Sequence, residues 1–221
     1  MPSVGPNFSI DEHRSAAQLP ELVWDTFRAH PCDANIMYPH AEKSRERERL
    51  GESADGLWIT CTTSNPFATP IIDFVLSCTE GPLGSYPIFL FTTIPKSEQH
   101  SEYCLRRIRH IVRRLARLVP PERIFSVFAP DQVTSVFASM WTEETGIRID
   151  SDPVYYAAKI SYCTKQSLRN KGYTLLPGVE YNLRLARDQD IAACAELCYG
   201  FAKESVSLSW GRQNKNLTPF R

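Results

Sequence analysis

The sequence predicts an α/β protein, with a mixed sheet covered by helices (α+β) and then the beginning of a second domain. Three observations predict this fold class. Residues 57–94 contain three apolar runs separated by turn residues, which is typical of an antiparallel meander. A long amphipathic helix follows, and the strand, helix and strand after it require a crossover connection. We therefore expect a first domain at 1–168, a polar linker at 169–180 and an incomplete second domain at 181–221.

The composition is that of a globular protein with balanced charge. Hydrophobic residues make up 43% of the 221 residues, and Lys+Arg and Asp+Glu each number 25. A neutral chain gives no reason to expect a nucleic acid or an anionic membrane as partner, so we expect neither. The first fifteen residues lack the basic and apolar regions of a secretory signal, and the seven cysteines lack zinc-finger spacing. We expect reduced thiols, no bound metal and a cytoplasmic protein, with the nucleus as the alternative.

The first two elements have different surfaces. Residues 19–30 place Leu19, Leu22, Val23 and Phe27 on one face of an amphipathic helix, which Pro31 ends. Residues 41–51 alternate in charge sign, so we expect a solvated helix or loop there.

Three strands are expected next. They are residues 57–63, 71–79 and 87–94, and turn residues bound each of them. The third run is almost entirely apolar, so we expect both of its faces to be buried.

A helix over 101–119 follows, with an apolar stripe on one side and six arginines over the remaining surface. We expect its arginines to form a solvated face, because that is the usual place for such a run. A strand at 124–129, a helix capped by Asp131 and ended by Gly146, and a last strand at 155–163 complete the domain. The stripe consists of Leu105, Ile108, Val112, Leu115 and Val119, flanked by Ile111 and Leu118.

The second domain begins with an expected strand at 181–186 and an amphipathic helix at 190–204, for which Asp188 or Asp190 would be the cap. Beyond it the apolar pattern ends. We expect the chain to be a truncated or alternatively spliced product.

The segment YNLRLARDQDIAACAELCYGFAKES at 181–205 resembles the opening of an N-acetyltransferase domain. The element order of 19–163 resembles the rest of that fold, and the helix end WTEETGI resembles the family's helix terminus. The chain is thus similar to the GNAT superfamily of coenzyme A-dependent N-acyltransferases, as a degenerate first copy and a truncated second, like some fungal tandem proteins.

The resemblance implies acetyl transfer from acetyl-CoA, as co-substrate, to an amine on a small molecule or peptide. Strands 87–94 and 124–129 would part to receive the cofactor. Glu80 would be either the amine-side base or a turn glutamate that points to water. The remaining implied contacts are with the cofactor: main-chain groups of Phe91, Thr92 and Thr93 for the pantetheine amides, and Lys96, Ser101 and Arg106 around the pyrophosphate at the helix start.

Two departures from the family pattern favour an alternative, a non-catalytic binding or scaffold module. The glycine-rich phosphate loop is replaced by residues 95–102, which contain no glycine and carry Glu98 and Glu102. The tyrosine that often protonates the thiolate is replaced by Trp141 or Thr142.

Several other residues leave alternatives open. Asp73 in an apolar strand is edge-facing, paired with an arginine, or functional. His100 is exposed or near the cofactor, and residues 35–40 occupy the position of a substrate-side loop. Tyr155, Tyr156 and Tyr162 either pack at a strand end or line a pocket.

Overall fold

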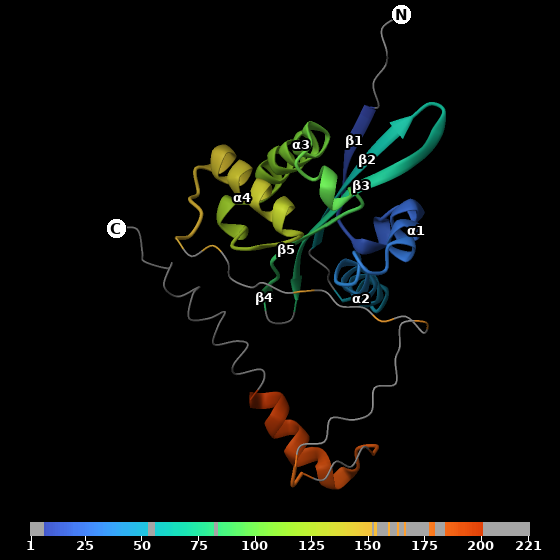
Figure 1. Cartoon of the computed structure of the whole chain (residues 1–221), viewed down its shortest axis with the longest axis vertical. Helices are drawn as coiled ribbons and strands as arrows, with labels where there is room; N and C mark the ends of the chain where they lie inside the picture. Colours follow the sequence, from blue (N-terminus) through green and yellow to red (C-terminus); the bar gives the residue numbers. More distant parts are fainter. Residues whose placement is uncertain are drawn as a thin grey trace, which may run out of the picture. The chain divides into compact units, whose positions relative to one another are not determined.

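A mixed sheet forms the centre of the first unit (Figure 1), and its strands run in the order β1-β2-β3-β5-β6, with β4 paired to β3. All neighbouring strands are antiparallel except β5 and β6, which are parallel. The predicted meander is confirmed, because β2, β3 and β5 are adjacent and antiparallel. The strands are β1 (Asn7–His13), β2 (Gly56–Asn65), β3 (Ala68–Gly81), β4 (Gly84–Ser85), β5 (Ile88–Thr92) and β6 (Val127–Phe128).

The computed structural model describes residues 7–52, 56–81, 84–151, 153, 159, 163, 166, 177–179 and 184–200. The chain divides into two units, Met1–Tyr162 and Cys163–Arg221. Among the described residues, no helix is long and apolar enough to span a membrane.

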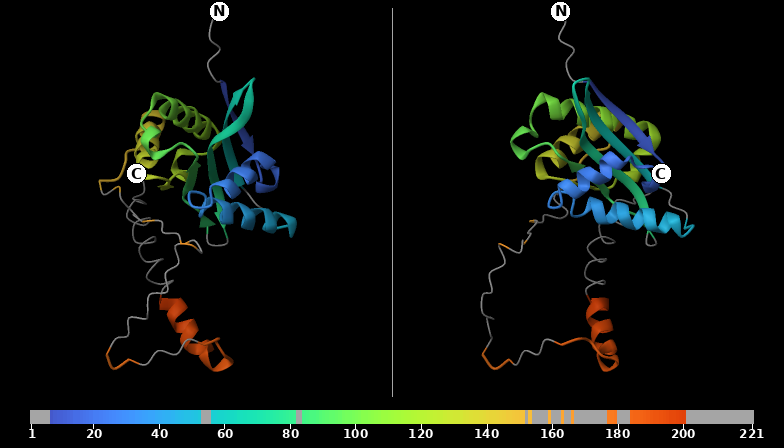
Figure 2. Two further views of the ribbon diagram at one scale, coloured as in Figure 1. Left: turned by 45° about the vertical axis from the view of Figure 1, so that its right-hand side comes forward. Right: turned by 90° about the vertical axis from the view of Figure 1, so that its right-hand side faces the viewer.

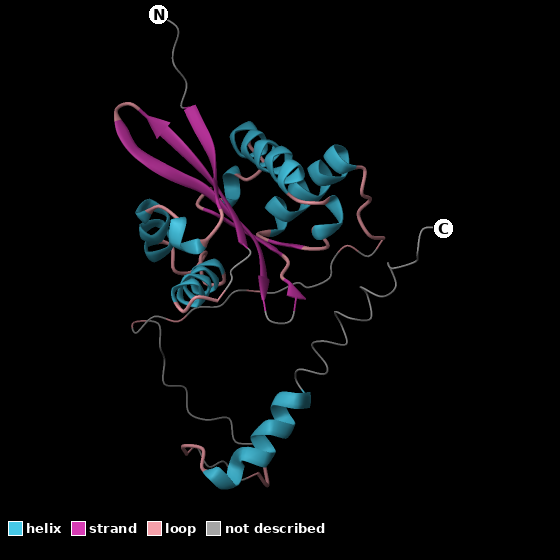
Figure 3. Cartoon of the chain, turned by 180° about the vertical axis from the view of Figure 1, so that it is seen from behind, coloured by secondary structure: helices cyan, strands magenta, loops and turns pink. Residues whose placement is uncertain are grey.

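Two helical layers cover the two faces of the sheet (Figures 2 and 3). One layer consists of α1 (Glu21–Ala29) and α2 (Met37–Arg49), and the other of α3 (Glu102–Leu118) and α4 (Asp131–Thr145). Alternate strand residues enter alternate layers, as the pleat of a strand requires: Trp58 and Val75 pack toward α1 and α2, and Ile59 and Leu76 toward α3 and α4. Short 3₁₀ turns connect the elements: η1 (Ala16–Gln18), η2 (Lys96–Glu98) and η3 (Pro121–Arg123).

The sequence explains where the helices begin and end. Ser101 caps α3, since its side chain accepts the amide of Cys104, and Pro120 follows its end. Gly146 ends α4 in the left-handed conformation, with φ 77°. Asp131 is the first residue of α4 rather than its cap, because Pro130 occupies the cap position and Asp131 makes no capping hydrogen bond.

Several expectations differ from the structure. Strand β1 was not expected, although Phe8 and Ile10 alternate with polar residues and pack against the core. Helix α2 starts at Met37, four residues before the expected element at 41. Pro39 is compatible with this start because it lies in the first turn of the helix, where main-chain N–H groups have no intrahelical partner. The expected strand 124–129 is reduced to Val127–Phe128.

A further difference concerns α3. Its buried stripe consists of Cys104, Arg107, Ile108, Ile111, Val112 and Leu115, so it includes one of the arginines that we expected in solvent. The expected last strand, 155–163, lies outside the described residues except for positions 159 and 163, which are not in a strand.

The second unit contains one described helix at 191–200, preceded by η4 (Asp188–Asp190). Asp190 accepts the Arg187 amide at 2.8 Å and pairs with Arg184 at 2.6 Å, so it stabilises the start of this helix. The expected strand 181–186 is wrong for 184–186, which have no strand pairing, and 181–183 lie outside the described residues.

Candidate functional site

The edge of β5 that faces β6 is open over its last residues. Pairing between the two strands consists of Ile88 with Val127 and Phe89 with Phe128. Strand β5 continues to Thr92, whereas β6 ends at Phe128 because Pro130, which lacks an N–H, leads directly into α4. Both residues of β6 are therefore paired, and β5 extends three residues beyond the last pair.

The main-chain groups of Thr92 point toward this open edge. Thr93 N donates to Asp73 O on β3, and Ile88 N donates to Ser126 O on the β6 side. Because main-chain groups alternate between the two edges of a strand, Thr92 shares the direction of Ile88. Its N–H and C=O lie beyond the last β5–β6 pair, although the residue is only 6% exposed.

The connection from β5 to α3 follows this edge. Lys96 and Glu98 are exposed in η2. Several amides here are already used, since Glu98 N donates to Pro95 O, Gln99 N to Lys96 O and Ser101 N to Glu98 O. The segment therefore offers fewer free amides than a glycine-rich loop, and Lys96 is the cation within it.

A buried polar cluster lies beneath the first turns of α3. Asp73 is 2% exposed and accepts hydrogen bonds from Arg107 Nε at 2.7 Å and from the Tyr103 hydroxyl at 2.7 Å. Thr63 donates to Asp73 at 2.5 Å and accepts from Arg107 Nη2 at 2.6 Å. Burial raises the pKa of Tyr103, so its hydroxyl remains a donor at neutral pH. Of the alternatives for Asp73, pairing with an arginine is the one observed.

A β-bulge directs Asp73 into this cluster. Cys61 pairs with Phe74 and Thr62 pairs with Ile72, so Asp73 is an extra residue on β3. Phe74 packs toward α3, and regular alternation would turn Asp73 toward α1. The bulge places both side chains on the α3 face.

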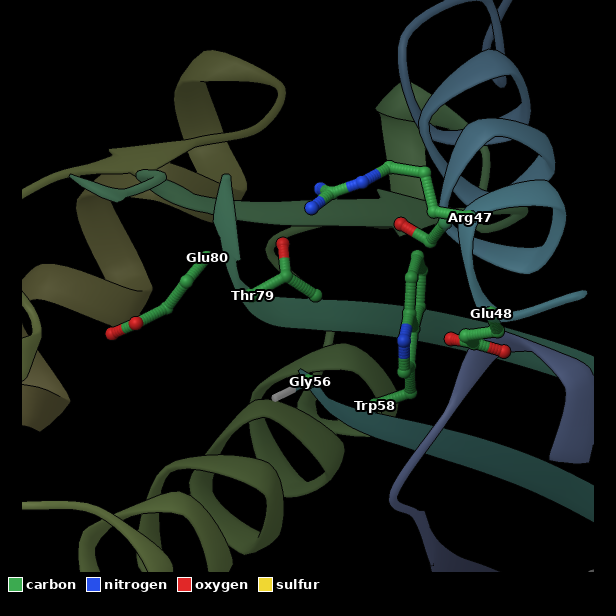
Figure 4. A pocket seen from close by; sticks show the side chains of 7 residues that line it. Arg47, Glu48, Gly56, Trp58, Thr79 and Glu80 are labelled. Atoms are coloured by element: carbon green, nitrogen blue, oxygen red, sulfur yellow. The ribbon is translucent and has the colours of Figure 1, made fainter. Parts of the chain in front are cut away.

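The opposite end of β3 carries Glu80, the predicted base. Glu80 is exposed, accepts a hydrogen bond from Ser85 Oγ at 3.0 Å and lies 3.9 Å from Arg123 Nε. It also borders a small pocket that Ser44, Arg47, Glu48, Gly56, Trp58 and Thr79 line. Figure 4 shows the Glu80 side chain leading away from the Trp58 indole, while Arg47 extends toward the Thr79 side. The indole N–H of Trp58 is buried and has no hydrogen-bond partner among the described residues.

His40 lies next to this pocket. Its Nε2 is 2.9 Å from the Thr79 hydroxyl, and Trp58, Tyr86 and Phe89 surround its ring. Burial, reinforced by the charge of Lys43, lowers the pKa of His40 to about 4. The ring is therefore neutral at physiological pH.

The structure brings some predicted site residues together and separates others. Phe91, Thr92, Thr93, Lys96 and Ser101 follow one another along the end of β5 and into α3. Three of them are already engaged: the Thr93 amide and hydroxyl bond to β3 carbonyls, the Phe91 side chain packs on Phe27, and the Ser101 side chain caps α3. His100 is exposed, as one of its two interpretations required.

Arg106 lies apart from this segment. Its guanidinium carbon is 5.8 Å from the ring centroid of Phe8 on β1, which is the edge of the sheet opposite β6. Tyr155, Tyr156 and Tyr162 lie outside the described residues. Trp141 is buried and stacks on Phe137 with a centroid distance of 6.1 Å.

Sequence reasoning placed His40 in a substrate-side loop at 35–40, but residues 37–40 lie in α2, and it did not identify which residues pair with Asp73. Helical spacing could have identified Arg107, because it lies three residues after Cys104 and four before Ile111, on the buried stripe. No sequence signal indicated Thr63, since its role depends on a bulge ten residues away.

Among the described residues, no group of three or more His, Cys, Asp or Glu side chains is placed to bind a metal. Comparison with known proteins finds no matching family model, curated protein or solved structure.

Proposed function

We propose that the first unit binds acetyl-CoA along the open edge of β5 and belongs to the N-acetyltransferase type. The observation that carries this proposal is the parallel pairing of β5 and β6, which stops at Phe89 and Phe128 while β5 continues to Thr92. A linear ligand with amide groups can pair with the free Thr92 main chain as an additional strand does. The element order, with an antiparallel meander followed by helix, strand and helix, agrees with the family resemblance.

The direction of the ligand follows from the sheet register. Its phosphates would lie near Lys96 and the start of α3, and its arm would run back along β5 toward Phe89. Ser77 pairs with Phe89, so Glu80 lies three residues beyond this point on the neighbouring strand. The thioester end would therefore approach the Glu80 end of the sheet, not the α3 end.

Transfer requires an attack of the neutral amine on the acetyl carbonyl carbon, with cleavage of the carbon–sulfur bond. The amine proton must leave to a base, directly or through water, and the thiolate must gain a proton. Glu80 is exposed and can accept such a proton when its contacts with Ser85 and Arg123 open. Trp141 cannot supply the second proton, because an indole is not acidic at neutral pH.

A second candidate, binding without transfer, is favoured by the connection at 95–101. Three of its amides bond to carbonyls of the same segment, and the carboxylates of Glu98 and Glu102 would repel a pyrophosphate. This segment therefore favours a module that binds the cofactor weakly and serves as a ligand sensor or a scaffold.

Calorimetric titration with acetyl-CoA tests binding. We expect a micromolar Kd and chemical-shift changes at the Thr92 amide, with Val75 in the interior of β3 as a reference position. Lys96→Ala should weaken binding several-fold, because it removes the cation of the segment that connects β5 to α3. Arg106→Ala is the matched control and should leave the Kd unchanged. Absence of heat at millimolar acetyl-CoA would overturn the proposal.

Release of free CoA thiol in the presence of a panel of amines separates the two candidates. If transfer occurs, Glu80→Gln should lower kcat and leave the Kd for acetyl-CoA unchanged. Binding without thiol release from any amine would support the second candidate.

A further inference from the structure

Asp73 joins the two chain segments that border the open edge of β5. Its carboxylate accepts from Tyr103 and Arg107, both in the first two turns of α3. Its main-chain oxygen accepts from the Thr92 hydroxyl at 2.8 Å and from the Thr93 amide at 3.2 Å. One residue of β3 therefore fixes both the end of β5 and the beginning of α3.

The connection between these two segments contributes less to their spacing. Residues 95–98 are exposed, so they pack against little that could fix their position. Gln99 is buried and donates to Ile94 O at 3.0 Å. This hydrogen bond joins two residues of the connection and does not attach the connection to a strand. Asp73 and its partners thus add directed contacts between Thr92 and α3 to the apolar packing of Ile94 and of the buried α3 stripe.

Stability alone does not explain a charged pair at this place. Asp73 is 2% exposed and Arg107 is 3% exposed, and apolar residues of similar volume often replace such a buried pair without loss of stability. A guanidinium with Nε on Asp73, Nη2 on Thr63 and Nη1 on the Tyr103 carbonyl, however, permits one orientation of α3 on the sheet. Such a directional contact fixes position in a way that apolar packing does not.

We infer that the Asp73–Arg107 pair is a positioning device for acetyl-CoA binding, which holds the Thr92 main chain and the start of α3 at the spacing that the cofactor spans. Both side chains are buried, so neither touches the ligand, and their effect passes through Thr92, Thr93 and α3. This inference rests on the proposed function.

The test uses two double variants of the full chain. Asp73→Leu/Arg107→Met removes the pair without leaving an unpaired buried charge. Glu12→Leu/Arg114→Met is the matched control, because it removes another ion pair between α3 and the sheet, at the β1 edge. The urea midpoint, hydrogen exchange of the Thr93 amide without ligand, and the Kd for acetyl-CoA are measured for both variants and the wild type.

We expect the Asp73/Arg107 variant to retain its urea midpoint, to exchange the Thr93 amide at least tenfold faster and to bind acetyl-CoA at least tenfold more weakly. The control variant should change neither the exchange nor the Kd by more than twofold. If the Asp73/Arg107 variant does not fold, Arg107→Lys replaces it, since lysine keeps the charge but cannot make the three directed bonds. It should give the same direction of change.

Two results overturn the inference. One is a wild-type Kd in the folded Asp73/Arg107 variant, and the other is unchanged Thr93 exchange. Failure of the wild type itself to bind acetyl-CoA refutes the proposed function and the role in cofactor affinity with it. In that case Thr93 exchange still decides whether Asp73 couples β5 to α3.

Discussion

The imidazole of His40 and the hydroxyl of Thr79 are hydrogen-bonded at 2.9 Å inside an aromatic enclosure. Ring centroids of Trp58, Tyr86 and Phe89 lie 5.5, 5.3 and 5.3 Å from that of His40. The surroundings disfavour a positive charge on the ring, which makes this contact sensitive to acid.

Acidification between pH 6.5 and 4 should destabilise the protein through His40. The pKa of His40 falls from 6.5 in the unfolded chain to about 4 in the folded one, mainly through burial. In this window the unfolded chain binds the proton first, so the free energy of unfolding decreases as the pH falls. The full effect, below pH 4, is about 3 kcal/mol at 1.36 kcal/mol per pKa unit.

Urea unfolding of the wild type and of His40→Gln over this pH range measures the effect. Glutamine can still bond to Thr79 but does not titrate, so the difference in stability between the two proteins should change with pH. His13 and His110, whose pKa values burial also lowers, contribute equally to both curves. Parallel curves would show that His40 does not titrate in this way.

Gly81→Ala should lower the free energy of unfolding by about 1 kcal/mol, the low end of the range for overpacking, because the 37% exposed Tyr86 side chain can move aside. A Cβ at this position would lie 2.5 Å from the Tyr86 hydroxyl oxygen and 2.6 Å from its ring carbons. Urea unfolding with Tyr86→Ala and the double variant completes the cycle. The Gly81 substitution should have little effect once Tyr86 is absent, and equal effects in both backgrounds would contradict the steric explanation.

Phe27→Ala should destabilise the first unit by about 3–5 kcal/mol. Phe27 is 0% exposed and lies 5.3 Å from the Phe91 ring and 6.0 Å from the Tyr38 ring, between α1, α2 and β5. Phe67→Ala is the control, because this phenylalanine is 97% exposed and should change stability by less than about 0.5 kcal/mol. Equal urea midpoints for the two variants would refute the assignment of the α1–α2 layer to the core.

Gly146→Ala should destabilise α4 by about 1–2 kcal/mol, since a Cβ is strained in the left-handed conformation that ends this helix. Gly146→Asn should be milder, because asparagine tolerates this conformation better. Thermal unfolding of both variants checks the order. No atom lies within 4 Å of the added Cβ, so backbone strain alone determines the expected order. A larger loss of stability with asparagine than with alanine would contradict this explanation.

Thiol alkylation at pH 7.5 should separate two groups of cysteines. Burial raises the pKa of Cys104 to about 11 and raises those of Cys61 and Cys78, so these three should react slowly. Cys194 and Cys198 are exposed and should react within minutes. Mass spectrometry after timed iodoacetamide treatment measures the rates, with urea-unfolded protein as the reference. Fast reaction of Cys61 under native conditions would disagree with its burial between β2 and α3.

Much of the fold could be predicted because it depends on local periodicity. The strands of the meander and helices α1, α3 and α4 appear close to the expected positions, since apolar spacing and proline or glycine punctuation determine them. Strand β1 was missed although its apolar and polar residues alternate. It has few apolar residues, so its alternation indicates a strand only once its pairing with β2 is known.

The candidate site was less predictable, because it depends on contacts between distant residues. The main-chain direction of Thr92 follows from the pairing of Thr93 with Asp73, and the position of Arg106 follows from the orientation of α3 over β1. Neither the direction of the Thr92 main chain nor the position of Arg106 can be predicted from the spacing of nearby residues in the sequence. Asp73 was recognised as unusual, but its bulge was not visible in the sequence.

The bulge in β3 also limits how this strand can change in length. Loss of a single residue beside Asp73 would restore regular pleating and turn the carboxylate into the apolar layer around Phe27. The Arg107 guanidinium would then remain under α3 without a counter-charge. Insertions and deletions at this point of the chain are therefore expected to be far more harmful than most substitutions.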